Sequence, residues 1–342
     1  MSWPKKLYYR LASGFPMNWL QRAAGIPVLL PYHHLVSDEP VPHVRHLFPY
    51  KNKKQFISDL DFLLRHFHPQ DPGSLIGAMR DGKVPRPGSF LLSFDDGLRE
   101  CYDVIAPILL SKGVPAFFFL NPAFLDNREL FYRSKMSLVL EQIEMRPPSR
   151  ALGHQIRLAL GLMPDNPAGL HRAILEVDYQ RREVADLLGT YLEISFPDYL
   201  RQRQPYLSSE QVRYLHTRGF GIGAHSLDHP NFRLLSLDEQ LRQTRQSCDW
   251  IRRHFSPDYT IFSFPHEDAG VSQNFFDALA DDLPRIDLLL GTQNQNMEWN
   301  NRVMHRFNAE RPAYPIEGLV KGILLYHLRK RSVLRKGAHQ SL

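Results

Sequence analysis

Asp95 and Asp96 are adjacent carboxylates at the end of an apolar run, 90–94, and Gly97 follows them. Adjacent carboxylates repel each other, so a fold that holds two together usually supplies a cation or a proton. Asp-Gly is also ordinary turn chemistry, and taken alone this motif favours a simple strand-to-turn junction. The pair is therefore a candidate site that needs support from elsewhere in the chain.

His225 and His229 supply that support, because they also follow an apolar run, 221–224. Histidines four residues apart can turn their rings toward one point if the segment is helical or tightly turned. Two imidazoles with the carboxylate of Asp96 would form a three-ligand metal site with open positions for water and substrate. Asp95 would then be free to act as a base. A histidine pair without further support, by contrast, more often consists of surface or core residues with no chemical role.

Three further strand ends carry candidate residues. His33 ends the first apolar run, and an imidazole there suits a general acid, although a strand cap or a buried hydrogen bond is the simpler interpretation. Pro265 and His266 follow the run 260–264, where a backbone N–H could stabilise an oxyanion, or where a proline simply ends a strand. Arg306 could orient a carboxylate, although an arginine at a strand end is more often structural.

Parallel strands are predicted to position these side chains. The predicted strands are 26–32, 90–94, 116–120, 221–224, 260–264, 288–290 and 303–306. Most are continuous apolar runs, as expected for parallel strands buried on both faces, and amphipathic helices such as 54–66 and 237–255 lie between them. This alternation predicts an α/β barrel or a doubly wound sheet. In a barrel, the carboxyl ends of the strands carry the active site.

The domain organisation follows from the same pattern. We expect an N-terminal helical segment at 1–25, a barrel at 26–317, and a basic C-terminal tail at 318–342. The stretch 128–207 breaks the alternation with helical patterns, which predicts a helical insertion in the loop after the third strand.

The net charge, the cysteine content and the distribution of apolar residues argue against several classes of protein. The 342 residues carry a formal net charge of +6, much of it in the tail, so the rest is near neutral and a nucleic-acid partner is not indicated. Two distant cysteines make no disulfide framework. The first 25 residues have no uninterrupted apolar core, which favours a cytoplasmic location over secretion. The apolar stretch 318–326 with its basic tail could contact an anionic membrane surface, but a last helix packed on the barrel is favoured.

The motifs together resemble those of the polysaccharide deacetylase family, carbohydrate esterase family four. Phe94-Asp95-Asp96-Gly97 and His225-Ser226-Leu227-Asp228-His229 resemble its first two motifs, and the early Tyr32-His33-His34 resembles the opening of its poly-N-acetylglucosamine deacetylase subgroup. The similarity runs in pieces from about Pro27 to Phe307 and leaves out 128–207.

The resemblance implies a distorted barrel of seven strands and hydrolysis of N-acetylated sugars or glycans. Asp95 would be the general base, and Asp96, His225 and His229 would bind a divalent cation, often zinc in this family. The cation would polarise the acetamide carbonyl and activate water. His33 matches the position of the acid in the subgroup, so it would protonate the leaving amine.

Two departures from the family pattern stand out. The third motif of the family contains an arginine that positions the base, but this chain has Ser263-Phe264-Pro265-His266, and Arg306 is a possible substitute. The late leucine-any-histidine motif has no clear copy. Two alternatives therefore stay open: a metal-dependent amidohydrolase acting on another C–N bond, such as that of a nucleotide-linked sugar, and a non-catalytic sugar-binding relative. Retention of Asp95 argues against the second alternative.

Overall fold

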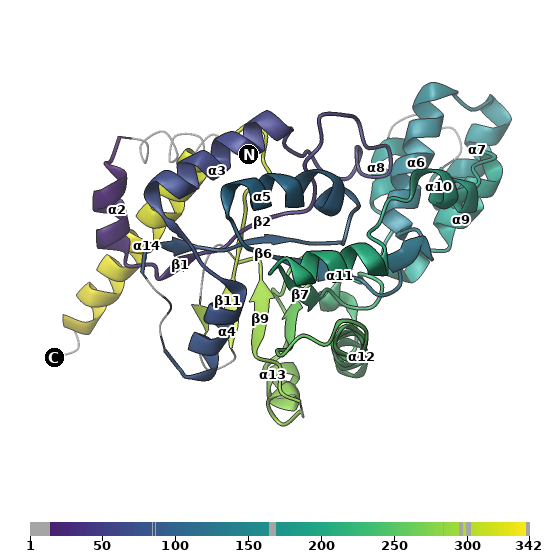
Figure 1. Ribbon diagram of the computed structural model, residues 1–342. Helices are drawn as coiled ribbons and strands as arrows, with labels where there is room; N and C mark the ends of the chain where they lie inside the picture. Colours follow the sequence, from purple (N-terminus) through teal and green to yellow (C-terminus); the bar gives the residue numbers. More distant parts are fainter. Residues whose placement is uncertain are drawn as a thin grey trace.

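The computed structural model has a barrel of parallel strands at its centre, surrounded by helices (Figure 1). It describes residues 14–83, 85, 87–163, 169–282, 284–293, 297–298 and 302–339. The barrel strands are β2 (Pro31–His33), β5 (Leu92–Phe94), β6 (Ala116–Leu120), β7 (Gly221–Ala224), β8 (Ile261–Ser263), β9 (Leu288–Gly291), β11 (Val303–His305) and β12 (Phe307–Asn308). The predicted barrel of alternating strands and helices is confirmed.

The barrel closes through a single break in its last strand. β11 pairs with β9 and β12 pairs with β2, both in parallel, and only Arg306 separates β11 from β12. The eight parallel strands therefore correspond to seven positions around the barrel, because β11 and β12 are successive parts of one segment. This closure places Arg306 where its side chain reaches Ser93 and Asp95 at the end of β5 and Ser263 of β8.

Two of the predicted strands are each broken into two pieces. The run 26–32 becomes β1 (Val28–Leu29) and β2, and the run 90–94 becomes β4 (Ser89–Phe90) and β5. β1, β4 and β3 (His68–Pro69) form a separate parallel sheet of three short strands. β10 (Met297–Glu298) pairs antiparallel with β11 at the other edge. The apolar pattern does not reveal these breaks because residues on both sides of each break are buried.

Helices follow most of the strands and cover the barrel. They are α3 (Lys53–His66), α4 (Pro72–Arg80), a π-helical turn (Cys101–Ile105) leading into α5 (Ala106–Lys112), α11 (Ser209–Thr217), α12 (Leu237–Phe255) and α13 (Gln273–Ala280). The amide of Gln55 donates to the side chain of Asn52 at the start of α3, and the Gln55 side chain accepts from the Asn52 amide in return. Phe56, Leu60 and Leu63 of this helix are buried against the barrel, as the helical spacing predicts.

A group of helices between β6 and α11 lies to one side of the barrel, in teal in Figure 1. It comprises α6 (Tyr132–Met145), α7 (Arg150–Ala159), α8 (Leu170–Leu175), α9 (Val184–Tyr191) and α10 (Phe196–Arg203). These helices share a hydrophobic cluster separate from the main core, which includes Val139, Ile156, Ile174 and Leu188 and also residues outside the insertion such as Leu35 and Leu98. Their positions fall inside the stretch 128–207 for which a helical insertion is predicted.

The two ends of the described chain pack together. α2 (Met17–Ala24) lies against α14 (Ile316–His339), and Leu319, Val320 and Leu324 of α14 are buried in the main core. These three apolar side chains are therefore covered within the fold. Within the described residues, no helix combines the length and apolarity needed to cross a membrane. Residues 1–13 of the predicted N-terminal segment and 340–342 of the tail lie outside the described part.

Candidate active site

The first motif sits where β5 ends. Asp95 is buried, and its backbone amide donates to the carbonyl oxygen of His33 on the neighbouring strand β2, at 3.0 Å. Asp96 and Gly97 then take positive φ angles of 70° and 62°, which turn the chain sharply away from the strand. Positive φ is unfavourable for a residue with a Cβ, and such strain is characteristic of functional sites. The turn directs two successive carboxylates to different partners.

Asp95 is held by Arg306. Nη1 and Nη2 of the arginine lie 2.7 and 2.8 Å from the two oxygens of Asp95, and Nη1 also donates to Oγ of Ser93 at 2.9 Å. The guanidinium is fully buried. Burial alone would raise the pKa of the Asp95 carboxyl, but Arg306, assisted by His225, outweighs burial and holds this pKa below its ordinary value. Asp95 is thus an ionised carboxylate in a fixed orientation, as expected if Arg306 orients it.

Asp96 lies against the two histidines of the second motif. Its Oδ1 is 3.1 Å from Nε2 of His229 and 3.5 Å from Nε2 of His225. Nε2 of His225 is also 3.9 Å from Oδ2 of Asp95. Burial would raise the pKa of Asp96, but the two imidazoles lower it well below its ordinary value. The structure therefore brings both motifs to one point at the carboxyl ends of β5 and β7.

Hydrogen bonds fix the turn that follows β7. Nδ1 of His225 lies 2.8 Å from the carbonyl oxygen of Ser263, so it donates there while Nε2 faces Asp96. The side-chain amide of Asn121 donates to the carbonyl of His225. Oγ of Ser226 accepts from the backbone amide of His229 at 3.0 Å. These bonds hold the two rings toward Asp96 even though Ser226 and His229 both have positive φ.

The donor set fits a divalent cation such as zinc. Asp96, His225 and His229 each offer one ligand atom, and these atoms lie within 4.8 Å of one another. Oδ1 of Asp96 is buried without a hydrogen-bond donor, as a metal ligand would be. The hydrogen bond from His225 to a backbone carbonyl is the support that metal-binding histidines commonly have. Two imidazoles and one carboxylate leave coordination positions open.

His33 does not reach this site. Its side chain is 1% exposed and packs against Phe56 and Phe94, and burial together with Lys51 lowers its pKa well below the ordinary value. It is therefore neutral and is not among the residues that line the pocket, so its position does not support the predicted role as the acid. The reason is strand alternation: Tyr32 and His34 face the pocket, while the intervening His33 faces α3.

His34 occupies the position expected of His33. Its Nδ1 lies 2.7 Å from Oε2 of Glu310, and the other oxygen of that carboxylate accepts from the backbone amides of His34 and Leu35. Burial would lower the pKa of His34, but Glu310 outweighs burial and raises it to about 9. His34 is therefore protonated at neutral pH and lies in the pocket wall. His34 directly follows His33 in the sequence. The two differ in which face of the chain at the end of strand β2 their side chains point to.

A pocket of about 220 Å³ opens above the clustered side chains. Its lining residues are Tyr32, His34, Leu47, Phe48, Asp95, Asp96, Phe131, Arg133, His225, His229, Phe264, His266 and Thr292. His266 has a φ of 57°, its ring packs against His229, and burial lowers its pKa well below the ordinary value. Pro265 is buried just before it and does not line the pocket. Residues from the loop after β2 and from the start of α6 contribute the walls that sequence patterns did not predict.

The insertion also contacts the second motif directly. The hydroxyl of Tyr179 donates to Oδ2 of Asp228 at 2.5 Å, and the side-chain amide of Gln243 donates to Oδ1 at 2.7 Å. Asp228 lies between the two histidines of the motif in sequence. This carboxylate thus connects the helical insertion and α12 to the turn that carries His225 and His229.

Comparison with known proteins finds a family whose model matches part of the chain. The family model "Polysaccharide deacetylase" matches residues 174–280, which contain His225, His229 and His266. The matched segment begins after Asp95 and ends before Arg306. Among proteins with curated functions, none matches the sequence. Over the matched third of the chain the sequence is similar to the polysaccharide deacetylase family, and the candidate ligands His225 and His229 lie inside the matched segment. The match indicates an enzyme of the class of hydrolases that act on carbon–nitrogen bonds.

Solved structures share the fold along most of the chain. The Streptococcus pyogenes deacetylase PplD, in complex with acetate, is 13% identical with a TM-score of 0.55, and the match covers 87% of this chain and 99% of that protein. IcaB from Ammonifex degensii is 13% identical with a TM-score of 0.54, covering 87% and 98%. A de-N-acetylase from Aggregatibacter actinomycetemcomitans is 15% identical with a TM-score of 0.52, covering 85% and 99%. At these identities the likeness extends to the fold alone.

Proposed function

We propose that this protein is a metal-dependent N-deacetylase that removes acetyl groups from N-acetylated sugars or glycans. The observation that carries the proposal is an ionised base, Asp95, held by Arg306 beside the Asp96–His225–His229 cluster at the floor of one pocket. A divalent cation bound by those three residues would polarise the acetamide carbonyl and make water more acidic. The names of the structural relatives, which include deacetylases and a de-N-acetylase, agree with this chemistry.

Two residues of the chain, Asp95 and His34, carry out the two proton transfers of the proposed reaction. Asp95 accepts the proton of the attacking water, and Arg306 keeps its two oxygens in the orientation that this transfer needs. His34 lines the same pocket, and its pKa of about 9 keeps it protonated at neutral pH. It donates that proton to the amine nitrogen as the C–N bond breaks, which yields acetate and a free amino sugar. His266 contributes its backbone N–H or its neutral ring beside the developing oxyanion.

The size of the pocket favours a substrate that presents one sugar unit. Its volume of about 220 Å³ is below the range of roughly 300–1,000 Å³ typical of drug-sized ligands. Phe48 and Phe131 supply aromatic surface on its walls. A small glycan or a nucleotide-linked sugar therefore suits it better than several units of a polymer bound end to end.

The test is acetate release with defined metal content. Purified protein is stripped with a chelator, reloaded with zinc, and assayed on N-acetylglucosamine oligomers and on nucleotide-linked N-acetyl sugars. We expect release that depends on the metal and that Asp95→Asn abolishes, while the exposed Asp103→Asn retains it. Bound metal without release from any sugar would instead favour the amidohydrolase or the sugar-binding relative. Failure to bind metal after reloading would refute the assignment of Asp96, His225 and His229.

A further inference from the structure

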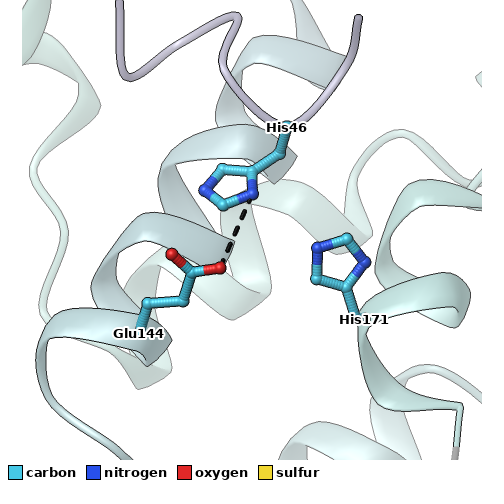
Figure 2. Close-up of side chains that lie close together, drawn as sticks. All are labelled: His46, Glu144 and His171. Carbon is cyan, nitrogen blue, oxygen red and sulfur yellow. Dashed lines mark ion pairs between the residues drawn. The ribbon is translucent and has the colours of Figure 1, made fainter. Parts of the chain in front are cut away.

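A second group of metal-type side chains lies outside the pocket (Figure 2). His46 belongs to the loop between β2 and α3, Glu144 lies in the last turn of α6, and His171 lies in α8. Their nearest ligand atoms all lie within 4.8 Å of one another. Figure 2 shows the two imidazole rings and the carboxylate gathered around one space. Three segments far apart in sequence therefore present two nitrogen donors and one oxygen donor to a common point.

The spacing is close to that of a bound cation. Nδ1 of His46 lies 3.8 Å from Oε1 of Glu144. Zinc bonds of about 2.0–2.1 Å in a tetrahedron would bring two ligand atoms to roughly 3.4 Å from each other. The ligand atom of His171 lies within 4.8 Å of the other two. Glu144 and His171 are exposed, so their side chains have room to rotate toward a common ion.

The least mobile ligand is already oriented for metal. The side chain of His46 is 7% exposed, and its Nε2 lies 3.1 Å from Oε2 of Glu141. With Nε2 directed to that carboxylate, Nδ1 faces Glu144 on the other side of the ring. A carboxylate behind a histidine is the arrangement that commonly supports a metal-binding imidazole.

The charged side chains around this group carry a net negative charge, which favours a bound cation. Arg45 contacts Glu141 through Nη1 at 3.0 Å and Oε2 of Glu144 through Nη2 at 3.1 Å. Two carboxylates against one guanidinium leave a net charge of −1 when both histidines are neutral. Oε1 of Glu144 remains directed to His46 while Oε2 faces Arg45. The arginine therefore orients Glu144 without neutralising the group.

We propose that His46, Glu144 and His171 form a second, structural site for a divalent cation of the zinc class. Imidazole nitrogens with a carboxylate are ligands that zinc binds well. Leu47 and Phe48 directly follow His46 and line the pocket. The cation would therefore anchor this wall of the pocket to α6 and α8 of the insertion. This inference goes beyond the proposed function and does not depend on it.

The experiment counts zinc in the full chain. Protein is equilibrated with excess zinc, free metal is removed by dialysis, and the bound metal is measured together with the melting temperature. We expect two zinc ions per chain in the unmodified protein, one in His171→Ala, one in Asp96→Asn, and none in the double variant. His154→Ala, which removes an exposed histidine of the same insertion, should still bind two. Zinc should also raise the melting temperature of His171→Ala less than that of His154→Ala, because a cation that binds the folded state stabilises it.

The single variants separate this inference from the proposed function. If His171→Ala binds as much zinc as the unmodified protein, the second site is refuted, and Arg45, Glu141, Glu144 and His46 form an ion-pair network that needs no cation. If Asp96→Asn alone leaves the count unchanged, the proposed active-site metal fails while the second site stands. A zinc count that falls equally in His154→Ala and His171→Ala would also overturn the inference.

Discussion

Replacement of Arg306 by lysine tests the positioning of the base. The guanidinium bonds both oxygens of Asp95, Oγ of Ser93 and Oγ of Ser263 from a fully buried position. Lysine keeps the positive charge, but its ammonium is a single point and cannot hold both carboxylate oxygens in a planar fork. At least one charge-assisted hydrogen bond to Asp95 is lost, and each such bond contributes roughly 1.5–3 kcal/mol.

The rate effect follows from that loss. We assume that the free energy of the lost hydrogen bond raises the activation barrier in full. At about 1.36 kcal/mol per factor of ten in rate, kcat/KM then falls by roughly 10- to 150-fold. We expect the fall to appear mainly in kcat, because Arg306 contacts the base rather than the pocket surface. Arg302→Lys is the matched control, since this nearby arginine donates to the carbonyl of Ile286; its effect should stay within about twofold.

The decisive assay combines Arg306→Lys with Asp95→Asn. If Arg306 acts through Asp95, the double variant should be about as slow as Asp95→Asn alone, because the group being positioned is already lost. The assay is steady-state acetate release at saturating zinc, with circular dichroism to confirm folding. A double variant whose loss equals the product of the two single losses would refute the reasoning, as would a fully active Arg306→Lys.

Two further predictions concern the neighbouring histidines His33 and His34 and the buried pair of Asp268 and His305. His34→Gln should lower kcat by roughly 10²- to 10⁴-fold, since it removes a proton donor, whereas His33→Phe should retain most activity because His33 packs among phenylalanines; the reverse order in an acetate-release assay would contradict the placement of the acid. Asp268 lies 2.6 Å from His305. Burial would raise the Asp268 pKa, but His305 outweighs burial and lowers it. Its stabilisation is therefore complete above the unfolded value of about 3.9 and is lost as pH falls through the folded pKa. In urea unfolding, the deficit of Asp268→Asn should be full at pH 7 and shrink below about pH 4; an equal deficit at both pH values would contradict the assignment.

The barrel was predictable because its strands are buried on both faces and appear as short apolar runs. The runs 116–120 and 221–224 coincide with β6 and β7. The breaks at Leu30 and Leu91 were not predictable, since these residues are as apolar and buried as their neighbours. The short strands β3, β10 and β12 contain two residues each, too few to show any periodicity.

The candidate site was predictable where one strand end supplies the whole motif. Asp95, Asp96, His225 and His229 follow their strands directly, so strand ends alone bring them to one rim. The choice between His33 and His34 depends on the phase of a three-residue strand, and a pattern that short does not determine which side chain faces inward. The partner of His34, Glu310, lies 276 residues away along the chain and is reached only through closure by β12.

The residues that carry the chemistry of the pocket and those that shape its walls come from different parts of the fold. The base and the candidate metal ligands are carried by barrel strands, which the buried core and the Arg306–Asp95 pair hold in place. The walls at Phe48 and Arg133 come from a loop and from the insertion, which pack in a hydrophobic cluster separate from the main core. Substitutions in that second cluster should therefore alter KM and substrate choice before they alter kcat. A cation bound between His46 and the insertion would act on the same walls, and so on substrate recognition rather than on the hydrolytic step.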